Sequence, residues 1–201
     1  MIRDQLTSPR FNIAFALSLV CFTISACADN KPAVEASTNK RAEYEATVKE
    51  LRKSAEAGDA SAQYRLGLLY DVGAGVSPNY GQAKEWFEKA AKQGHAGAQA
   101  NLGTLYLQGR GAPQSSQMAL FWLSRAAEQG NVLAFTKLGS MYAEGRGVLQ
   151  DFTQAHMWYN LAAVQGEPRA AEARDALTKQ MTPAQIAEAQ RLAREWKPKG
   201  Q

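Results

Sequence analysis

The side chains that most often perform chemistry are few in this chain and lie far apart. Its 201 residues include two histidines, His95 and His156, and two cysteines, Cys21 and Cys27, both near the N-terminus. Catalysis needs a nucleophile, an acid–base group or a metal held in a fixed geometry, and two histidines alone cannot complete a structural zinc site. We expect His95 to begin a helix and His156 to lie at the surface or half-buried. The sequence therefore predicts a protein that is not an enzyme and that holds no cofactor or metal.

Cys27 is the one side chain for which the sequence predicts a covalent role. Two arginines precede an apolar run at residues 11–22, which is shorter than the roughly 20 residues of a membrane-spanning helix. A basic start, a short apolar run and small residues after it are typical of a secretory signal peptide. Residues 24–27, Ile-Ser-Ala-Cys, resemble the bacterial lipobox, in which the cysteine becomes the acylated first residue of the mature chain. Ordinary cleavage after Ala28 is the main alternative, and an uncleaved anchor helix is a third.

The two cleavage hypotheses predict different locations for the protein. Residues 1–26 are the predicted signal peptide, with the lipoprotein type favoured, and residues 27–40 are polar and contain Pro32, which indicates a flexible tether. If Cys27 is acylated, its lipid places the protein on a membrane, and by resemblance to bacterial lipoproteins Ala28 favours the outer membrane. Without acylation, the protein is expected to be soluble in the periplasm.

A 36-residue unit, repeated three times without insertion, organises the rest of the chain. The units cover residues 58–93, 94–129 and 130–165. A fixed period of this length is the sequence signature of stacked repeats, in which each unit buries its apolar face on its neighbours. The recurring residues of the middle unit, which have counterparts 36 residues earlier and later, are Leu102, Gly103, Tyr106, Gly109, Gly111, Ala119, Trp122, Ala126, Ala127 and Gln129.

Each unit is predicted to form two antiparallel helices. Ala62, Leu66 and Tyr70 are spaced four residues apart, as in one stripe along a helix. Gly73 is expected to end this first helix in a left-handed conformation. The second helix begins after Asn, Ser or Asp at residues 79, 115 and 151, all of which are good N-cap residues. Its buried stripe is predicted to contain the tryptophan of the unit and the recurring alanines.

A glycine inside the first helix predicts close packing between the two helices. Gly67 recurs in the other two units, although glycine costs about 1 kcal/mol relative to alanine within a helix. We expect the second helix to approach closely there, because Ala83, Ala90 and Ala91 would present small side chains.

Less regular segments flank the three units. Residues 41–57 are predicted to form an N-terminal capping helix, a degenerate half-unit in which Glu50 stands at the tryptophan position. Residues 166–198 are predicted to form a C-terminal helical cap, in which Thr182 followed by Pro183 gives a helix-start signal. The residues expected to form one face of the last helix are Ile186, Ala189, Ala193 and Trp196.

The recurring pattern resembles that of the Sel1-like repeat family, which is related to the tetratricopeptide repeats. It reads Ala-x3-Leu-Gly-x2-Tyr-x2-Gly-x-Gly and then Ala-x2-Trp-[Phe/Tyr]-x2-Ala-Ala, over residues 62–91, 98–127 and 134–163. The second unit departs from it at Ala112-Pro113 and at Leu123, which replaces the aromatic residue. The resemblance implies an all-α fold, a right-handed α/α superhelical solenoid of three helix pairs with capping helices at both ends.

The resemblance also implies a concave face, lined by the first helix of each unit, that holds peptides or other proteins. Arg65, Asn101 and Lys137 share one position in their units and would form a polar row on this face. The alternative is a solvated face without a ligand. The other residues expected in the groove, all at positions that vary between units, are Tyr64, Leu68, Ala100, Thr104, Leu107, Thr136, Ser140 and Glu144, with Asp71, Gln108 and Leu133 beside them.

The sequence thus predicts a non-catalytic scaffold of the bacterial cell envelope that binds an unidentified protein or peptide. The alternative is a structural or ligand-binding envelope lipoprotein that engages the cell wall or regulates an envelope enzyme. The net charge of +4 is small and evenly mixed, so it does not indicate nucleic-acid binding.

Overall fold

The computed structural model describes residues 46–74 and 76–199, and within these ranges the regular structure is entirely helical. The chain divides into two units, residues 1–44 and 45–201, and only the second is described here. The predicted signal peptide, Cys27, the tether and residues 41–45 of the N-terminal capping helix lie outside the described residues. Among the described residues, no helix has the length and apolar content needed to cross a membrane.

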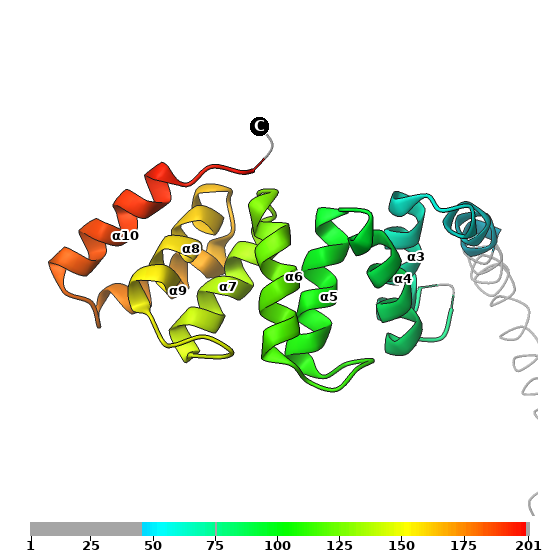
Figure 1. Ribbon diagram of the computed structural model, residues 1–201, viewed down its shortest axis with the longest axis horizontal. Coiled ribbons are helices and arrows are strands. Elements are labelled where there is room, and N and C mark those ends of the chain that lie inside the picture. The colour runs from blue at the N-terminus through cyan, green and yellow to red at the C-terminus, as the bar shows by residue number, and fades with distance from the viewer. Residues whose placement is uncertain (1–45, 75, 200–201) are drawn as a thin grey trace, which may run out of the picture. The chain divides into compact units, whose positions relative to one another are not determined.

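Nine helical segments follow one another along the described chain (Figure 1). The two helices of each pair pack on each other, and each pair packs on the next one, which is the architecture of a solenoid. Both of the last two helices pack on the second helix of the third pair, so they form the C-terminal cap. The segments are residues 46–56, α3 (Ala60–Val72), α4 (Tyr80–Lys92), α5 (Ala96–Gln108), α6 (Ser116–Glu128), α7 (Val132–Glu144), α8 (Phe152–Val164), α9 (Pro168–Thr178) and α10 (Pro183–Glu195).

The predicted start and stop signals of the helices are confirmed. The side chains of Asn79, Ser115 and Asp151 accept hydrogen bonds from backbone N–H groups in the first turns of α4, α6 and α8. Gly73 ends α3 in the left-handed region, with φ 79°, as predicted. At the start of α10, Thr182 and the glutamine three residues later form a reciprocal capping box.

The glycine inside each first helix permits close packing, as predicted, but against a larger side chain than expected. A Cβ atom at Gly67 would lie 2.6 Å from a ring carbon of Phe87, and one at Gly139 would lie 2.6 Å from a ring carbon of Tyr159. The prediction that the facing residues are the alanines of the second helix was therefore wrong. The residue after each tryptophan, which is Phe87, Leu123 or Tyr159, lies on the bare backbone instead, because its side chain needs the space that a Cβ would fill.

The core contains most of the predicted apolar stripe. The three recurring alanines of α4 and α6 are fully buried, and Trp122 is 7% exposed. The tryptophans of the other two units, Trp86 and Trp158, are half-buried and pack on the edge of the core. In the cap, Ala189 and Ala193 are buried, so the predicted inner face of α10 is confirmed.

A ladder of glutamines joins the N-terminal units and was not predicted. Buried Gln63 donates to the carbonyl of Ala55, at 3.0 Å, and accepts from Gln93, at 2.8 Å. The same arrangement recurs one unit later, where Gln99 donates to the carbonyl of Ala91 and accepts from Gln129. In the third unit, Phe135 occupies the position of Gln63 and Gln99, and the ladder does not continue.

An arginine in the loop of the second and third units reaches back to the unit before it. Arg146 donates to the backbone carbonyl of Leu107, at 3.1 Å. Arg110 forms an ion pair with Asp71, at 3.4 Å, and its guanidinium lies 3.8 Å from the centre of the Tyr80 ring. The first unit has an alanine at this position. The loop arginines therefore tie consecutive units together at the ends of their first helices.

Candidate binding surface

The polar row predicted on the first helices lies on α3, α5 and α7. Arg65 is exposed, whereas Asn101 and Lys137 are half-buried. Within residues 46–74 and 76–199, none of the three side chains forms a hydrogen bond or an ion pair. Their donors are therefore available to a ligand or to water.

Tyr64, predicted in the groove, takes part in the contact between the first two units. Its ring stacks on that of His95, with centroids 4.4 Å apart, and lies 6.0 Å from that of Phe87. A Cβ atom at Gly97 would lie 3.0 Å from the Tyr64 ring, so the two helices are close there. Leu68 is half-buried and packs on the same core cluster. Both side chains therefore contribute to the fold with part of their surface.

Several predicted groove residues satisfy their hydrogen bonds within their own helix. The hydroxyls of Thr104 and Thr136 donate to the backbone carbonyls of Ala100 and Val132, at 2.9 and 3.1 Å. The hydroxyl of Ser140 donates to the Glu144 carboxylate, four residues later, at 2.7 Å. These side chains offer a partner acceptor atoms more readily than donors.

Two predicted groove residues do not reach the surface. Ala100 is fully buried and Leu107 is 7% exposed, and both belong to the apolar core that includes Phe135. Their prediction as surface residues was wrong, because positions that differ between units can still lie where units pack on one another.

The two histidines differ from each other in their surroundings. His95 is the N-cap of α5, where its Nδ1 accepts from the backbone N–H of Ala98, at 3.2 Å, as expected of a helix-start residue. His156 was predicted at the surface or half-buried, but it is 3% exposed, and its Nδ1 has no hydrogen-bond partner among the described residues. Burial lowers the pKa of His156 and the charge of Arg174 lowers it further, while Asp175 opposes the effect. The neutral form is therefore favoured.

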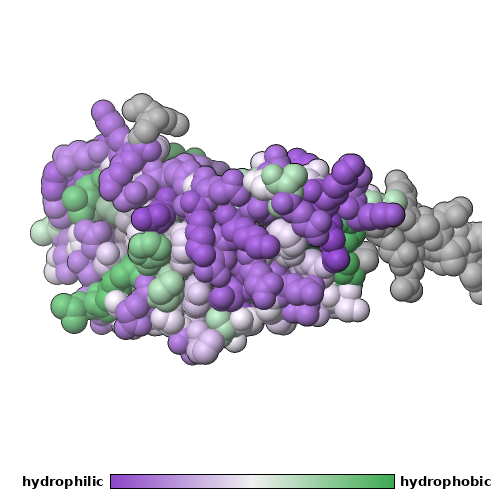
Figure 2. Space-filling view, turned by 45° about the vertical axis from the view of Figure 1, so that its right-hand side comes forward, coloured by the Kyte–Doolittle hydropathy of each residue, from purple (hydrophilic) through white to green (hydrophobic). Residues whose placement is uncertain are grey.

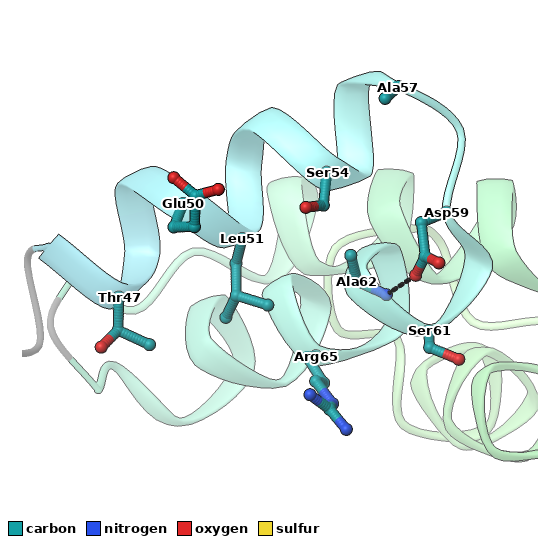
Figure 3. A pocket seen from close by; sticks show the side chains of 9 residues that line it. All are labelled: Thr47, Glu50, Leu51, Ser54, Ala57, Asp59, Ser61, Ala62 and Arg65. Atoms are coloured by element: carbon teal, nitrogen blue, oxygen red, sulfur yellow. Dashed lines mark hydrogen bonds between the residues drawn. The ribbon is translucent and has the colours of Figure 1, made fainter.

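A cavity of about 730 Å³ lies between the helix at residues 46–56 and the start of α3 (Figure 3). Arg65 is the one predicted site residue that lines it. The sequence feature that corresponds to this cavity is Glu50, which stands where the later units have a tryptophan. Of the described residues, those that line it are Thr47, Glu50, Leu51, Ser54, Ala57, Asp59, Ser61, Ala62 and Arg65.

The surface offers little apolar area for a broad hydrophobic interface on the face shown in Figure 2, where hydrophilic residues predominate and hydrophobic ones gather in small patches. On α6, Met118 and Phe121 are 39% and 45% exposed, and the guanidinium of Arg125 lies 4.6 Å from the centre of the Phe121 ring.

In the described part of the chain, no group of three His, Cys, Asp or Glu side chains could hold a metal ion.

The repeats match a known protein family. The model of the Sel1 repeat matches residues 60–95, 96–131 and 135–167, more than half of the chain. The chain belongs to the Sel1 repeat family. No curated protein matches it significantly.

Two solved structures of Sel1 repeat proteins are similar to this one, each at 33% sequence identity. One is a protective antigen present in uropathogenic Escherichia coli strains, which displays the Sel1-like repeat fold; its TM-score is 0.58, and the match covers 74% of this chain and 40% of that protein. The other is a Sel1 repeat protein from Oxalobacter formigenes, with a TM-score of 0.64 and coverage of 75% and 62%. This chain thus spans less than two thirds of either protein.

Proposed function

We propose that this protein is a non-catalytic scaffold of the bacterial cell envelope that binds a partner protein or peptide along the first helices of its repeats. Sel1 repeat proteins generally act as scaffolds for protein–protein interaction. The observation that supports this surface is the polar row of Arg65, Asn101 and Lys137, whose side chains have no partner within the described residues. A row of donors at one-unit steps suits an extended segment that offers backbone carbonyls or carboxylates.

The N-terminal sequence is the observation that supports the proposed envelope location. The apolar run and the lipobox-like residues ending at Cys27 support export and acylation. Metabolic labelling with a palmitate analogue tests the acylation: label is expected on the wild type and lost in Cys27→Ser. A Cys27→Ser variant that keeps the label would contradict it.

The binding surface is tested by crosslinked capture of partners from envelopes. Wild type is compared with a variant carrying Arg65→Ala, Asn101→Ala and Lys137→Ala. The matched control carries Lys179→Ala, Gln190→Ala and Arg194→Ala, which remove exposed polar side chains from the C-terminal cap.

We expect one protein to be captured by wild type and by the control and to be lost with the row variant, whose folding is checked by circular dichroism. An unchanged captured set with the folded row variant would overturn the proposal, and saturable binding to purified cell wall would then support the structural alternative.

A further inference from the structure

The helix at residues 46–56 corresponds to the second helix of a unit. In register with the 36-residue period, Leu51 stands at the position of Phe87, Leu123 and Tyr159. Each of those three side chains packs on the glycine inside the first helix of its own unit. They are 0%, 0% and 8% exposed, whereas Leu51 is half-buried. Among the described residues, no first helix covers Leu51 in the same way.

The sequence that precedes this helix does not carry the pattern of a first helix. By register, such a helix would occupy residues 24–36, which lie outside the described residues. Pro32 stands within this range, and proline costs about 3 kcal/mol in the interior of a helix. Asn30 and Lys31 stand where the units have leucine and glycine. The sequence therefore indicates that this chain does not itself supply the first helix of the N-terminal pair.

The cavity of about 730 Å³ has the two walls that a first helix contacts in the later units (Figure 3). One wall is the face of the N-terminal helix that presents Leu51 and Ser54, the latter at a position that is alanine in the units. The other wall includes Ser61 of α3, which corresponds to Gly97 of α5. A Cβ at Gly97 would lie 3.0 Å from the ring of Tyr64, on the preceding first helix. The cavity thus lies between a second helix and the first helix of the following unit.

The second unit shows what kind of helix packs on a leucine at this position. A Cβ at Gly103 would lie 2.7 Å from the side chain of Leu123, so the residue opposite the leucine must be small. Leu102, next to this glycine, is fully buried, and Tyr106 packs on the core three residues after it. Because Leu51 is also a leucine, a helix with the apolar stripe of α5 has the matching shape.

We propose that this cavity docks an amphipathic α-helix of a partner protein, one that carries the apolar stripe of a first helix. A glycine or alanine of that helix lies against Leu51, and the residue three positions earlier lies against Ser61. The contact is of the helix-in-groove kind, in which an apolar stripe is buried along a groove. The partner would complete the N-terminal pair and lengthen the array by one helix, which goes beyond the proposed binding of a segment along the first helices.

The probe is a peptide with the sequence of residues 95–109, held helical by a hydrocarbon staple between positions 104 and 108. These two positions lie outside the buried stripe of α5. The full chain labelled with ¹⁵N is titrated with the peptide, and backbone amide shifts are followed by NMR. We expect saturable shifts concentrated between residues 47 and 65.

The matched control peptide carries Gly103→Leu. It is more apolar than the probe, but its added side chain would collide with Leu51, so we expect no saturable shifts between residues 47 and 65. Non-specific hydrophobic adhesion would give the opposite order of affinity, because it increases with the apolar area of the peptide.

Matched variants of the protein locate the contact. Leu51→Asp places a charge against the apolar stripe and should weaken peptide binding by roughly tenfold or more. Leu149→Asp makes the same change at a leucine that is 91% exposed and does not line the cavity, so its affinity should equal that of wild type. Ser61→Trp should fill the cavity from an exposed position of α3 and abolish the shifts. Circular dichroism checks that each variant is folded.

The inference is overturned if the probe gives no saturable shifts in this region, if the Gly103→Leu peptide binds equally well, or if Leu51→Asp and Leu149→Asp bind alike. Binding that appears only after deletion of residues 28–40 would show that this segment covers the cavity instead. A dimer of the chain alone that Leu51→Asp dissociates would show that a second copy does so. The capture experiment on the polar row remains a separate test, because Asn101 and Lys137 do not line the described part of the cavity.

Discussion

The N-terminal and C-terminal halves of the solenoid are held together by different chemistry. In the N-terminal half, buried Gln63 and Gln99 bridge units through hydrogen bonds, and the first junction contains a polar cavity. In the C-terminal half, Phe135 takes the glutamine position and packs with Trp158 and Trp196, at centroid distances of 5.7 and 4.9 Å. One amino-acid position thus specifies either a polar bridge or an aromatic cluster, according to what the next helices can offer.

The aromatic cluster is expected to give the largest effect. Phe135→Ala should lower the free energy of unfolding by about 3–5 kcal/mol, because it removes a fully buried ring between two tryptophans. The measurement is urea denaturation followed by circular dichroism. Leu51→Ala is the comparison at the N-terminal end, where a half-buried side chain beside a cavity should cost less. An equal or larger loss at Leu51 would break the contrast between the two ends.

The glutamine ladder is expected to give an intermediate effect. Gln99→Leu keeps a similar volume but leaves the Ala91 carbonyl and the Gln129 amide without their partner, so we expect a loss of about 1–3 kcal/mol. Gln190→Leu, at an exposed position of α10, should stay within about 0.5 kcal/mol of wild type. If the two variants match in urea denaturation, the ladder does not stabilise the N-terminal half.

The smallest expected effect concerns pH and is confined to the C-terminal half. The pKa of His156 is lowered in the folded state from an ordinary 6.5, so the unfolded chain binds more protons there. Stability should therefore fall as pH drops below about 6.5 and level off below the folded pKa, by about 1.4 kcal/mol for each unit of lowering. The charged groups that act on His156 are Arg174 and Asp175, both from α9.

Two variants test this pH dependence through unfolding at pH 7.5 and pH 5. His156→Leu carries the residue that the second unit has at this position, and it should lose part of the pH slope. His95→Asn carries the residue of the third unit and keeps a helix cap, so its slope should match that of wild type. If His156→Leu keeps the full slope, the pH dependence arises elsewhere.

The fold could be predicted because its signals are local and recur. A glycine at a helix end, such as Gly73, or a capping residue, such as Asn79, acts through its own backbone neighbourhood, and three copies make chance agreement improbable. The stacking of units follows from the period alone. These signals do not depend on the exact separation of the helices.

The candidate site was harder to predict because variation between units is an imperfect sign of exposure. Ala100 and His156 occupy variable positions and are nevertheless buried, since each junction has its own neighbours. Gln99 is polar in sequence, and its burial depends on a carbonyl eight residues earlier in the chain. The cavity could not be predicted from the sequence. Glu50 shows that the tryptophan is absent from the N-terminal helix, but it does not give the distance between that helix and α3.

The loop arginines have a consequence for how the array can change in length. Arg110 and Arg146 each point to the preceding unit, and the left-handed glycine after each arginine lets the loop approach that neighbour. Every added unit therefore brings the means of attachment to the unit before it, while the first unit needs none. Duplication or deletion of a whole 36-residue segment from the middle of the chain leaves each unit after the first with its own arginine for this contact. The array can therefore be lengthened by whole units, each of which supplies its own arginine for the contact with the unit before it.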